Sequence, residues 1–274
     1  MTVINSNSSA LRAQNAGVQA NKMLGTAMER LSSGKRINSA KDDAAGLAIS
    51  SSMTSQIRGM NQGIRNANDG ISMAQTAEGA LEEVTNMMQR IRELAVQSTS
   101  GTYRDEDRTN IQAEVTELTA QITDILANTQ FNSVNLFDGS AGASGVVTIQ
   151  AGANAADVVT LNFGDLAGNT AITAVTGIDL TTANNTVLAT IDAGLDLINT
   201  TRATLGASQS RLESAAANLA NNVINLSDAR SRIMDADYSQ ETTALAKAQI
   251  LGQASTAMLA QANQSQQNVL SLLR

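Results

Sequence analysis

The densest cluster of charged side chains is the run Arg104 to Arg108, in which Asp105, Glu106 and Asp107 stand between two arginines. Carboxylate oxygens are the ligands that Mg²⁺ and Ca²⁺ prefer in proteins, so adjacent acidic residues could suggest a metal site. A regular pattern of apolar residues begins just after this run, however. Acidic residues in the first turn of a helix are favoured by the positive end of the helix dipole. We therefore expect the run to begin a helix and to hold no metal.

A second candidate is the run Ser33 to Lys35, whose small residues and lysine resemble part of a phosphate-binding loop. That loop also needs a glycine at position 29 and a serine or threonine directly after the lysine. The chain has Glu29 and Arg36 at those positions. The sequence therefore predicts no nucleotide and no other cofactor.

The composition excludes most other site chemistry. The 274 residues include no His, Cys, Pro or Trp. Without cysteine the chain has no disulfides, thiol nucleophiles or thiolate metal sites. Without histidine it lacks the commonest general base and the commonest zinc ligand. Chemistry that uses carboxylates alone, such as a glycosidase pair or a magnesium site, stays open on composition.

The charge and hydropathy patterns also limit the partners. The net charge of −7 argues against nucleic acid as the main partner. No apolar run approaches the roughly 18 residues that span a bilayer, so we expect no membrane partner. The first residues, MTVINSNSSALRAQ, lack the basic-then-apolar order of a cleavable signal peptide. If the protein leaves the cell, we expect a different export route.

The remaining composition describes helices. Hydrophobic residues make up 42% of the chain but aromatic residues only 2%, so the buried surface must come mainly from small and aliphatic side chains. That composition is typical of long helices packed side by side and not of an enzyme with a pocket. Apolar residues recur at alternating spacings of three and four, as in heptad packing. These stripes run over residues 10–31, 53–95, 111–125, 188–233 and 244–272.

The first and last stripes are narrow and rich in small residues. Two short helices of this kind bury little surface between them and should be marginal alone. We therefore expect them to be buried against other copies of the chain. The positions of this predicted assembly stripe are Ala10, Ala13, Gly17, Ala20, Leu24 and Leu31 near the N-terminus, and Leu251, Met258, Val269 and Leu272 near the C-terminus.

The heptads stop between about 131 and 185, where Gly, Asn, Thr, Val and Asp dominate. The β-branched runs 146–149 and 158–163 predict strands, and the intervening glycines predict turns. We expect a small β-rich lobe at which the chain reverses direction. The predicted fold is mainly α, a long antiparallel helix bundle whose terminal helices pair as a coiled coil.

Four runs carry a resemblance to one family, the bacterial flagellins. They lie in both halves of the chain, within about 1–140 and 186–274, and are specific in sequence. The runs are SSGKRINSAKDDAAGLAI at 32–49, QRIRELAVQS at 89–98, TQFNSVNLFDG at 129–139 and KAQILGQASTAMLAQANQSQQNVLSLLR at 247–274.

The resemblance implies a structural subunit that polymerises into the flagellar filament for motility, in a short form without large outer domains. It implies an inner terminal-helix domain of 1–44 plus 234–274. It also implies a bundle domain of 45–233, with helices at about 45–98, 104–128 and 186–233 and the lobe at 131–185. Export would occur unfolded, through the flagellar type III apparatus, to the extracellular filament. The implied partners are other copies of the chain, an export chaperone, the filament cap and the hook–filament junction proteins.

The resemblance also implies a surface for an innate immune receptor of animals, at Gln89, Arg90, Leu94, Gln97 and Glu114. Helical spacing places Arg90, Leu94 and Gln97 on one face, with Arg90 free to reach outward and Glu114 on the following helix. The alternative for this stretch is a plain packing surface between subunits.

The competing hypothesis for the whole chain is a secreted helical type III translocon or another coiled-coil interaction protein. Such proteins share the heptads and the export route. A membrane-active translocon should carry a strongly apolar hairpin, and the sequence has none. We therefore expect a filament subunit and no enzyme.

Overall fold

The computed structural model describes residues 6–182 and 184–271. The chain divides into two compact units. The first unit joins Met1–Ser55 with Asn225–Arg274, and the second is Gln56–Ile224. Both boundaries fall inside long helices, so each of these helices contributes to both units.

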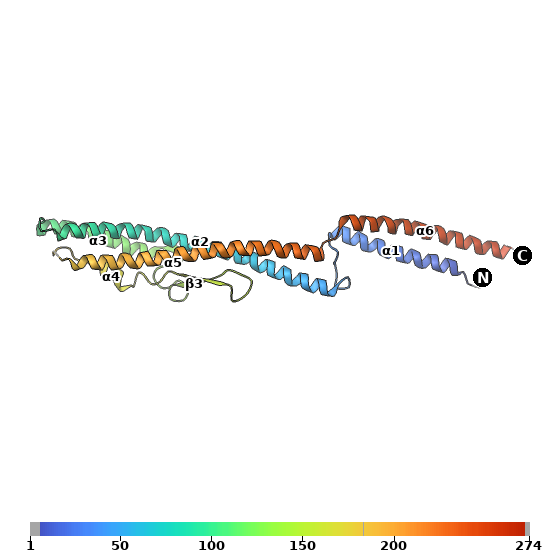
Figure 1. The fold of residues 1–274 in the computed structure, drawn as a ribbon, viewed down its shortest axis with the longest axis horizontal. Coiled ribbons are helices and arrows are strands. Elements are labelled where there is room, and N and C mark those ends of the chain that lie inside the picture. The colour runs from blue at the N-terminus through green and yellow to red at the C-terminus, as the bar shows by residue number, and fades with distance from the viewer. Residues whose placement is uncertain (1–5, 183, 272–274) are drawn as a thin grey trace. The chain divides into compact units, whose positions relative to one another are not determined.

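The first unit contains a pair of terminal helices, α1 (Ser8–Ser33) and α6 (Tyr238–Ser271), which lie side by side and antiparallel (Figure 1). The side chain of Asn7 caps the start of α1 by accepting a hydrogen bond from the Ala10 amide at 3.0 Å. Gly34 ends α1 in the left-handed conformation, with φ of +68°, which glycine adopts without steric cost.

Three helices dominate the second unit: α2 (Ala44–Thr99), α3 (Asp105–Asn128) and α5 (Thr186–Met234). The α2 and α5 helices run antiparallel (Figure 1). The acidic run Asp105 to Asp107 forms the first turn of α3, so the predicted helix start is confirmed. The Arg104 amide donates a hydrogen bond to the carboxylate of Asp107 at 3.2 Å, which satisfies one backbone donor at this helix end.

Two small antiparallel sheets occupy the chain reversal. β1 (Gln130–Phe131) pairs with β2 (Val134–Asn135). The predicted strands are confirmed as β3 (Val146–Gln150) and β4 (Val158–Asn162), in a register that pairs Val146 with Asn162 and Gln150 with Val158.

A short helix in the lobe, α4 (Thr170–Thr176), was not predicted. Its sequence, TAITAVT, is rich in β-branched residues, which favour strands in isolation. The Asn169 side chain accepts a hydrogen bond from the Ala171 amide at 2.9 Å and so caps the helix. Ile172 and Val175 are buried at helical spacing, and this tertiary contact outweighs the local propensity.

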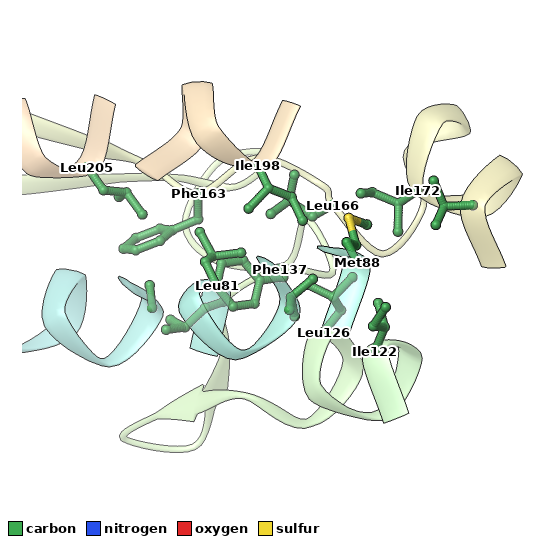
Figure 2. Packing of buried hydrophobic residues seen from close by; sticks show 14 of the residues in the cluster. Leu81, Met88, Ile122, Leu126, Phe137, Phe163, Leu166, Ile172, Ile198 and Leu205 are labelled. Atoms are coloured by element: carbon green, nitrogen blue, oxygen red, sulfur yellow. The ribbon is translucent and has the colours of Figure 1, made fainter. Parts of the chain in front are cut away.

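The core of the second unit lies where α2, α3 and α5 meet the lobe. Leu81 and Met88 of α2 pack there with the fully buried rings of Phe137 and Phe163 (Figure 2). The lobe therefore contributes to the bundle's own core. Together these elements confirm the predicted mainly α fold, with its long antiparallel helices, paired terminal helices and small β-rich lobe.

Candidate functional site

Small residues line the contact between α1 and α6. A Cβ added at Gly17 would lie 3.5 Å from the Cβ of Ser255, an ordinary van der Waals contact. Small side chains at heptad spacing let the two helices approach closely along a narrow seam. The buried positions of this seam are Ala13, Ala20 and Ala27 on α1, and Ala248, Ser255 and Ala262 on α6.

The predicted assembly stripe falls differently on the two helices. On α1, Ala13 and Ala20 are buried, and Ala10, Gly17, Leu24 and Leu31 are half-buried. On α6, Leu251 and Met258 are 38% and 51% exposed, so within one subunit they lie outside the buried seam. Val269 lies in α6, and Leu272 lies outside the described residues.

The geometry of α6 explains this difference. Residues 248, 255 and 262 of α6 are buried. Residues 252 and 259, which follow 248 and 255 by four positions, are half-buried. Leu251 and Met258 are one residue, about 100°, away from those neighbours. Small or apolar residues occupy both faces, so the sequence pattern could not tell which face meets α1.

Two polar contacts tie the pair together near opposite ends. The Arg30 guanidinium donates to the Glu241 carboxylate at 3.0 Å, between side chains that are 30% and 13% exposed. The Asn7 side chain donates to the Ala262 carbonyl oxygen at 3.1 Å. Each contact joins one specific residue of the N-terminal segment to one of α6. Together they therefore define the register of the two helices, which the small residues between them do not.

The two chain segments that connect these helices to α2 and α5 are also paired. The Arg36 amide donates to the Met234 carbonyl at 2.6 Å, and the Ala236 amide donates to the Gly34 carbonyl at 3.0 Å. The Arg36 guanidinium adds a hydrogen bond to the Ile233 carbonyl at 2.7 Å. This arginine therefore satisfies carbonyl groups that the end of α5 would otherwise leave without partners.

Large apolar side chains are exposed on both terminal helices. Tyr238 begins α6 and is 72% exposed. Several large apolar side chains of this helix pair are therefore open to solvent. The other exposed side chains are Leu11, Val18, Met23 and Met28 on α1, and Ile250, Leu251 and Met258 on α6.

The residues of the predicted receptor surface lie on α2 and α3. Gln89, Arg90, Gln97 and Glu114 are exposed. Arg90 donates through Nε to Glu114 at 2.9 Å and through Nη1 to Glu93 at 3.1 Å. The hydrogen bond with Glu114, followed by that with Glu93, raises the pKa of Arg90 above its ordinary value. Arg90 is therefore held between two carboxylates, whereas the helical spacing predicted a side chain free to reach outward.

Leu94 does not share this exposed surface, and its predicted place there is wrong for the isolated chain. Its side chain is 3% exposed and lies in the same core as Ile91 and Ala95. The buried face of α2 is wide at this level because both α3 and α5 contribute to the core around it. Arg90 and Gln97 are therefore exposed, whereas Leu94, which lies between them on the same side of the helix, is buried.

Sequence reasoning missed two further contacts of the second unit. Arg92 donates to Asp192 at 2.6 Å, and this hydrogen bond lowers the pKa of the carboxyl. The side-chain amide of Gln112 donates through its nitrogen to the Ile178 carbonyl at 3.0 Å, and its oxygen accepts from the Leu180 backbone amide at 2.7 Å. Each contact joins residues at least 66 positions apart, so no local pattern signals it.

Within residues 6–182 and 184–271, no group of three or more acidic side chains is arranged to hold a metal ion. In the same part of the chain, no helix combines the length and apolar character needed to cross a bilayer.

Comparison with known families accounts for both halves of the chain. The bacterial flagellin N-terminal helical region matches residues 4–142, and the bacterial flagellin C-terminal helical region matches residues 188–273. The chain belongs to the bacterial flagellin family. Members of this family are structural subunits of the flagellar filament, so the chain is a filament subunit and not an enzyme. The translocon hypothesis is not favoured.

Known relatives support this assignment over the full length. The chain is 45% identical to a flagellin of Halalkalibacterium halodurans, over 99% of this chain and 100% of that protein. It is 41% identical to the flagellin FlaB1 of Treponema pallidum over the same shares. Flagellin of Bacillus subtilis is also 41% identical, and 99% of each chain is covered.

Solved structures support the fold. The crystal structure of Bacillus cereus flagellin matches with a TM-score of 0.50 and 29% identity, over 57% of this chain and 88% of that one. A putative flagellar hook-associated protein from Vibrio parahaemolyticus also has a TM-score of 0.50, over 71% of this chain and 97% of that one. Its identity is 15%, so this second likeness concerns the fold alone.

Proposed function

We propose that this flagellin polymerises through its terminal helices, α1 and α6. The observation that carries the proposal is the exposed apolar surface of the helix pair, from Leu11 and Val18 on α1 to Ile250 and Met258 on α6. Exposed apolar side chains are unfavourable in water and are stabilised when a second copy covers them.

We infer that residues 1–44 and 234–274 form an inner domain of the filament, and that 45–233 form the surrounding bundle domain with its lobe. The division of the chain into two compact units supports an organisation in two parts, although the units divide near 55 and 225. The tie between Arg30 and Glu241 supports a paired arrangement of the termini within one subunit.

The finer aspects of the filament role are part of the same proposal. The chain is exported unfolded through the flagellar type III apparatus and joins the filament outside the cell. During this passage it meets an export chaperone, the filament cap and the hook–filament junction proteins. The absence of proline and cysteine suits this route, since refolding then involves no slow prolyl isomerisation and no disulfide exchange.

The assembly surface is tested by Val18→Asp, which places a charge on the exposed face of α1. We expect loss of sedimentable filaments, because a charge buried at an interface without a partner is strongly unfavourable. Circular dichroism should show unchanged helicity, since Val18 is 61% exposed in the subunit.

The matched control is Val134→Asp, which makes the same change at an exposed valine of the second unit. This variant should still form filaments. Normal polymerisation of Val18→Asp, or equal loss in both variants, would contradict the assignment of assembly to the terminal pair.

We further propose that monomers present Gln89, Arg90, Gln97 and Glu114 to an animal innate immune receptor. The supporting observation is that the ion pair of Arg90 with Glu114 joins α2 and α3 into one exposed polar patch. Leu94 is left out of this patch because it is buried.

A reporter-cell assay on monomers tests this second role, with Arg90→Ala as the variant and Arg92→Ala as the control. Both arginines are about half exposed and each is ion-paired, so their loss should affect folding similarly and little. We expect reduced signalling from Arg90→Ala alone. Equal potency of the two variants and the unchanged chain would remove the patch from the functional residues.

A further inference from the structure

The methionines of this chain are unevenly exposed. The sequence contains ten of them. Met73 and Met88, in the second unit, are 7% and 0% exposed. Within the described part of the chain, the methionines that are largely exposed all belong to the terminal helix pair: Met23 at 44%, Met28 at 56% and Met258 at 51%.

Two of these side chains line grooves between α1 and α6. Met23 lies with Ala27, Ala244 and Lys247 around one groove. Met258 lies with Ala13, Arg12 and Gln261 around another. A thioether at a groove between two helices is open to small solutes and also belongs to the apolar surface that a second copy would cover.

Methionine is the apolar side chain that mild oxidants convert into a polar one. A sulfur lone pair attacks one oxygen of hydrogen peroxide, and an S–O bond forms as the O–O bond breaks. The other oxygen leaves as water after it takes up the proton from the sulfur-bound hydroxyl. Methionine loses two electrons, peroxide gains them, and the product is the sulfoxide. Methionine sulfoxide reductases reverse the change.

We propose that Met23, Met28 and Met258 form an oxidation-sensitive site at which peroxide blocks self-assembly of the monomer. This inference rests on the proposed assembly role of the α1–α6 pair. A sulfoxide on this surface must give up hydration when a second copy covers it, and the polar, bulkier group no longer packs as the thioether does. Once assembled, the same sulfur atoms are shielded, so the free subunit is the vulnerable form.

The first experiment treats purified monomers with hydrogen peroxide and maps added oxygen by peptide mass spectrometry. We expect oxygen first at Met23, Met28 and Met258, together with loss of sedimentable filaments and little change in helicity. Treatment with both stereospecific sulfoxide reductases should restore polymerisation. Normal polymerisation of monomers that carry all three sulfoxides would overturn the inference.

The second experiment uses variants of similar side-chain volume. A triple variant, Met23→Leu with Met28→Leu and Met258→Leu, should polymerise after the same treatment, because leucine keeps the apolar surface and has no sulfur. The matched control, Met60→Leu with Met87→Leu, replaces half-buried methionines of the second unit and should remain sensitive. Equal protection by both variants would place the sensitive site elsewhere.

The third experiment separates this inference from the assembly proposal. Intact filaments are oxidised in parallel with monomers, and the rate of oxygen addition at the three methionines is compared. Slower oxidation in filaments supports both ideas. Equal rates would show that the terminal surface stays exposed after assembly and would refute the assembly role itself, whereas slow oxidation in filaments combined with normal assembly of oxidised monomers would refute the oxidation site alone.

Discussion

Replacing Gly63 by alanine tests how closely the loop of the β3–β4 hairpin approaches α2. A Cβ added there would lie 2.9 Å from the Gly152 amide nitrogen and 3.1 Å from the Ala151 carbonyl carbon. Both atoms are backbone atoms, so no side-chain rotation relieves the contact. The hairpin is also held nearby, since the Asn66 side chain donates to the Gln150 carbonyl at 3.0 Å.

Two opposing effects determine the result. Alanine stabilises a helix interior relative to glycine by about 1 kcal/mol. Forcing an additional methyl group into a packed site costs about 1–3 kcal/mol. Gly79→Ala, on the same helix, has no atom within 4 Å of the added Cβ, so only the first effect applies there. The difference between the two variants therefore isolates the steric cost, at about 1–3 kcal/mol.

Urea unfolding of the monomers, followed by circular dichroism, measures this difference. Gly79→Ala should be stabilised by about 1 kcal/mol, and Gly63→Ala should range from unchanged to about 2 kcal/mol less stable than the parent chain. In thermal unfolding, each kcal/mol corresponds to about 2–4 °C for a domain of this size. If both variants were stabilised equally, the hairpin would not touch α2 at this position.

Two further predictions concern the second unit and the pH dependence. Gln112→Leu removes the partners of the Ile178 carbonyl and the Leu180 amide, and should lower the free energy of unfolding by about 1–3 kcal/mol in urea titrations; an unchanged value would mean that these two hydrogen bonds contribute nothing. Hydrogen bonds lower the pKa of two carboxyl groups in the folded chain. The largest contribution comes from the Ser39 backbone for Asp42 and from the Arg92 side chain for Asp192. Their stabilisation is therefore complete above the ordinary pKa of about 4 and is lost as the pH falls through the lowered values. Monomer stability should be flat between about pH 5.5 and 7.5 and should fall below about pH 4, with a shallower fall in Asp192→Asn; a transition near pH 6–7 in unfolding curves would contradict this.

The heptad pattern was sufficient to predict the long helices, because alternating spacings of three and four describe a helical face directly. The stripe over 53–95 lies within α2, which spans Ala44–Thr99. The β-branched runs likewise located β3 and β4. These elements are determined by side chains close together in the sequence.

Three features of the structure could not be predicted from the local pattern. Met258 belongs to a stripe of α6 in which small or apolar residues are both buried and exposed, so the pattern does not specify which of them meet α1. Leu94 lies on a helix that contributes to a core shared with two others, which widens its buried face beyond a single stripe. The hydrogen bonds of the Gln112 side chain with Ile178 and Leu180 depend on a chain reversal, and no local pattern encodes them.

The long sequence separation of the α1–α6 contacts has a consequence for synthesis of the chain. Arg30 and its partner Glu241 are 211 residues apart. At a translation rate of roughly 5–20 residues per second, about 10–40 s pass between the appearance of the first residue and that of the second. Throughout this interval α1 has left the ribosome without the helix against which it packs. The α1 segment is therefore made well before α6 and packs only after α6 has been made, so any factor that acts during translation meets α1 without its partner helix.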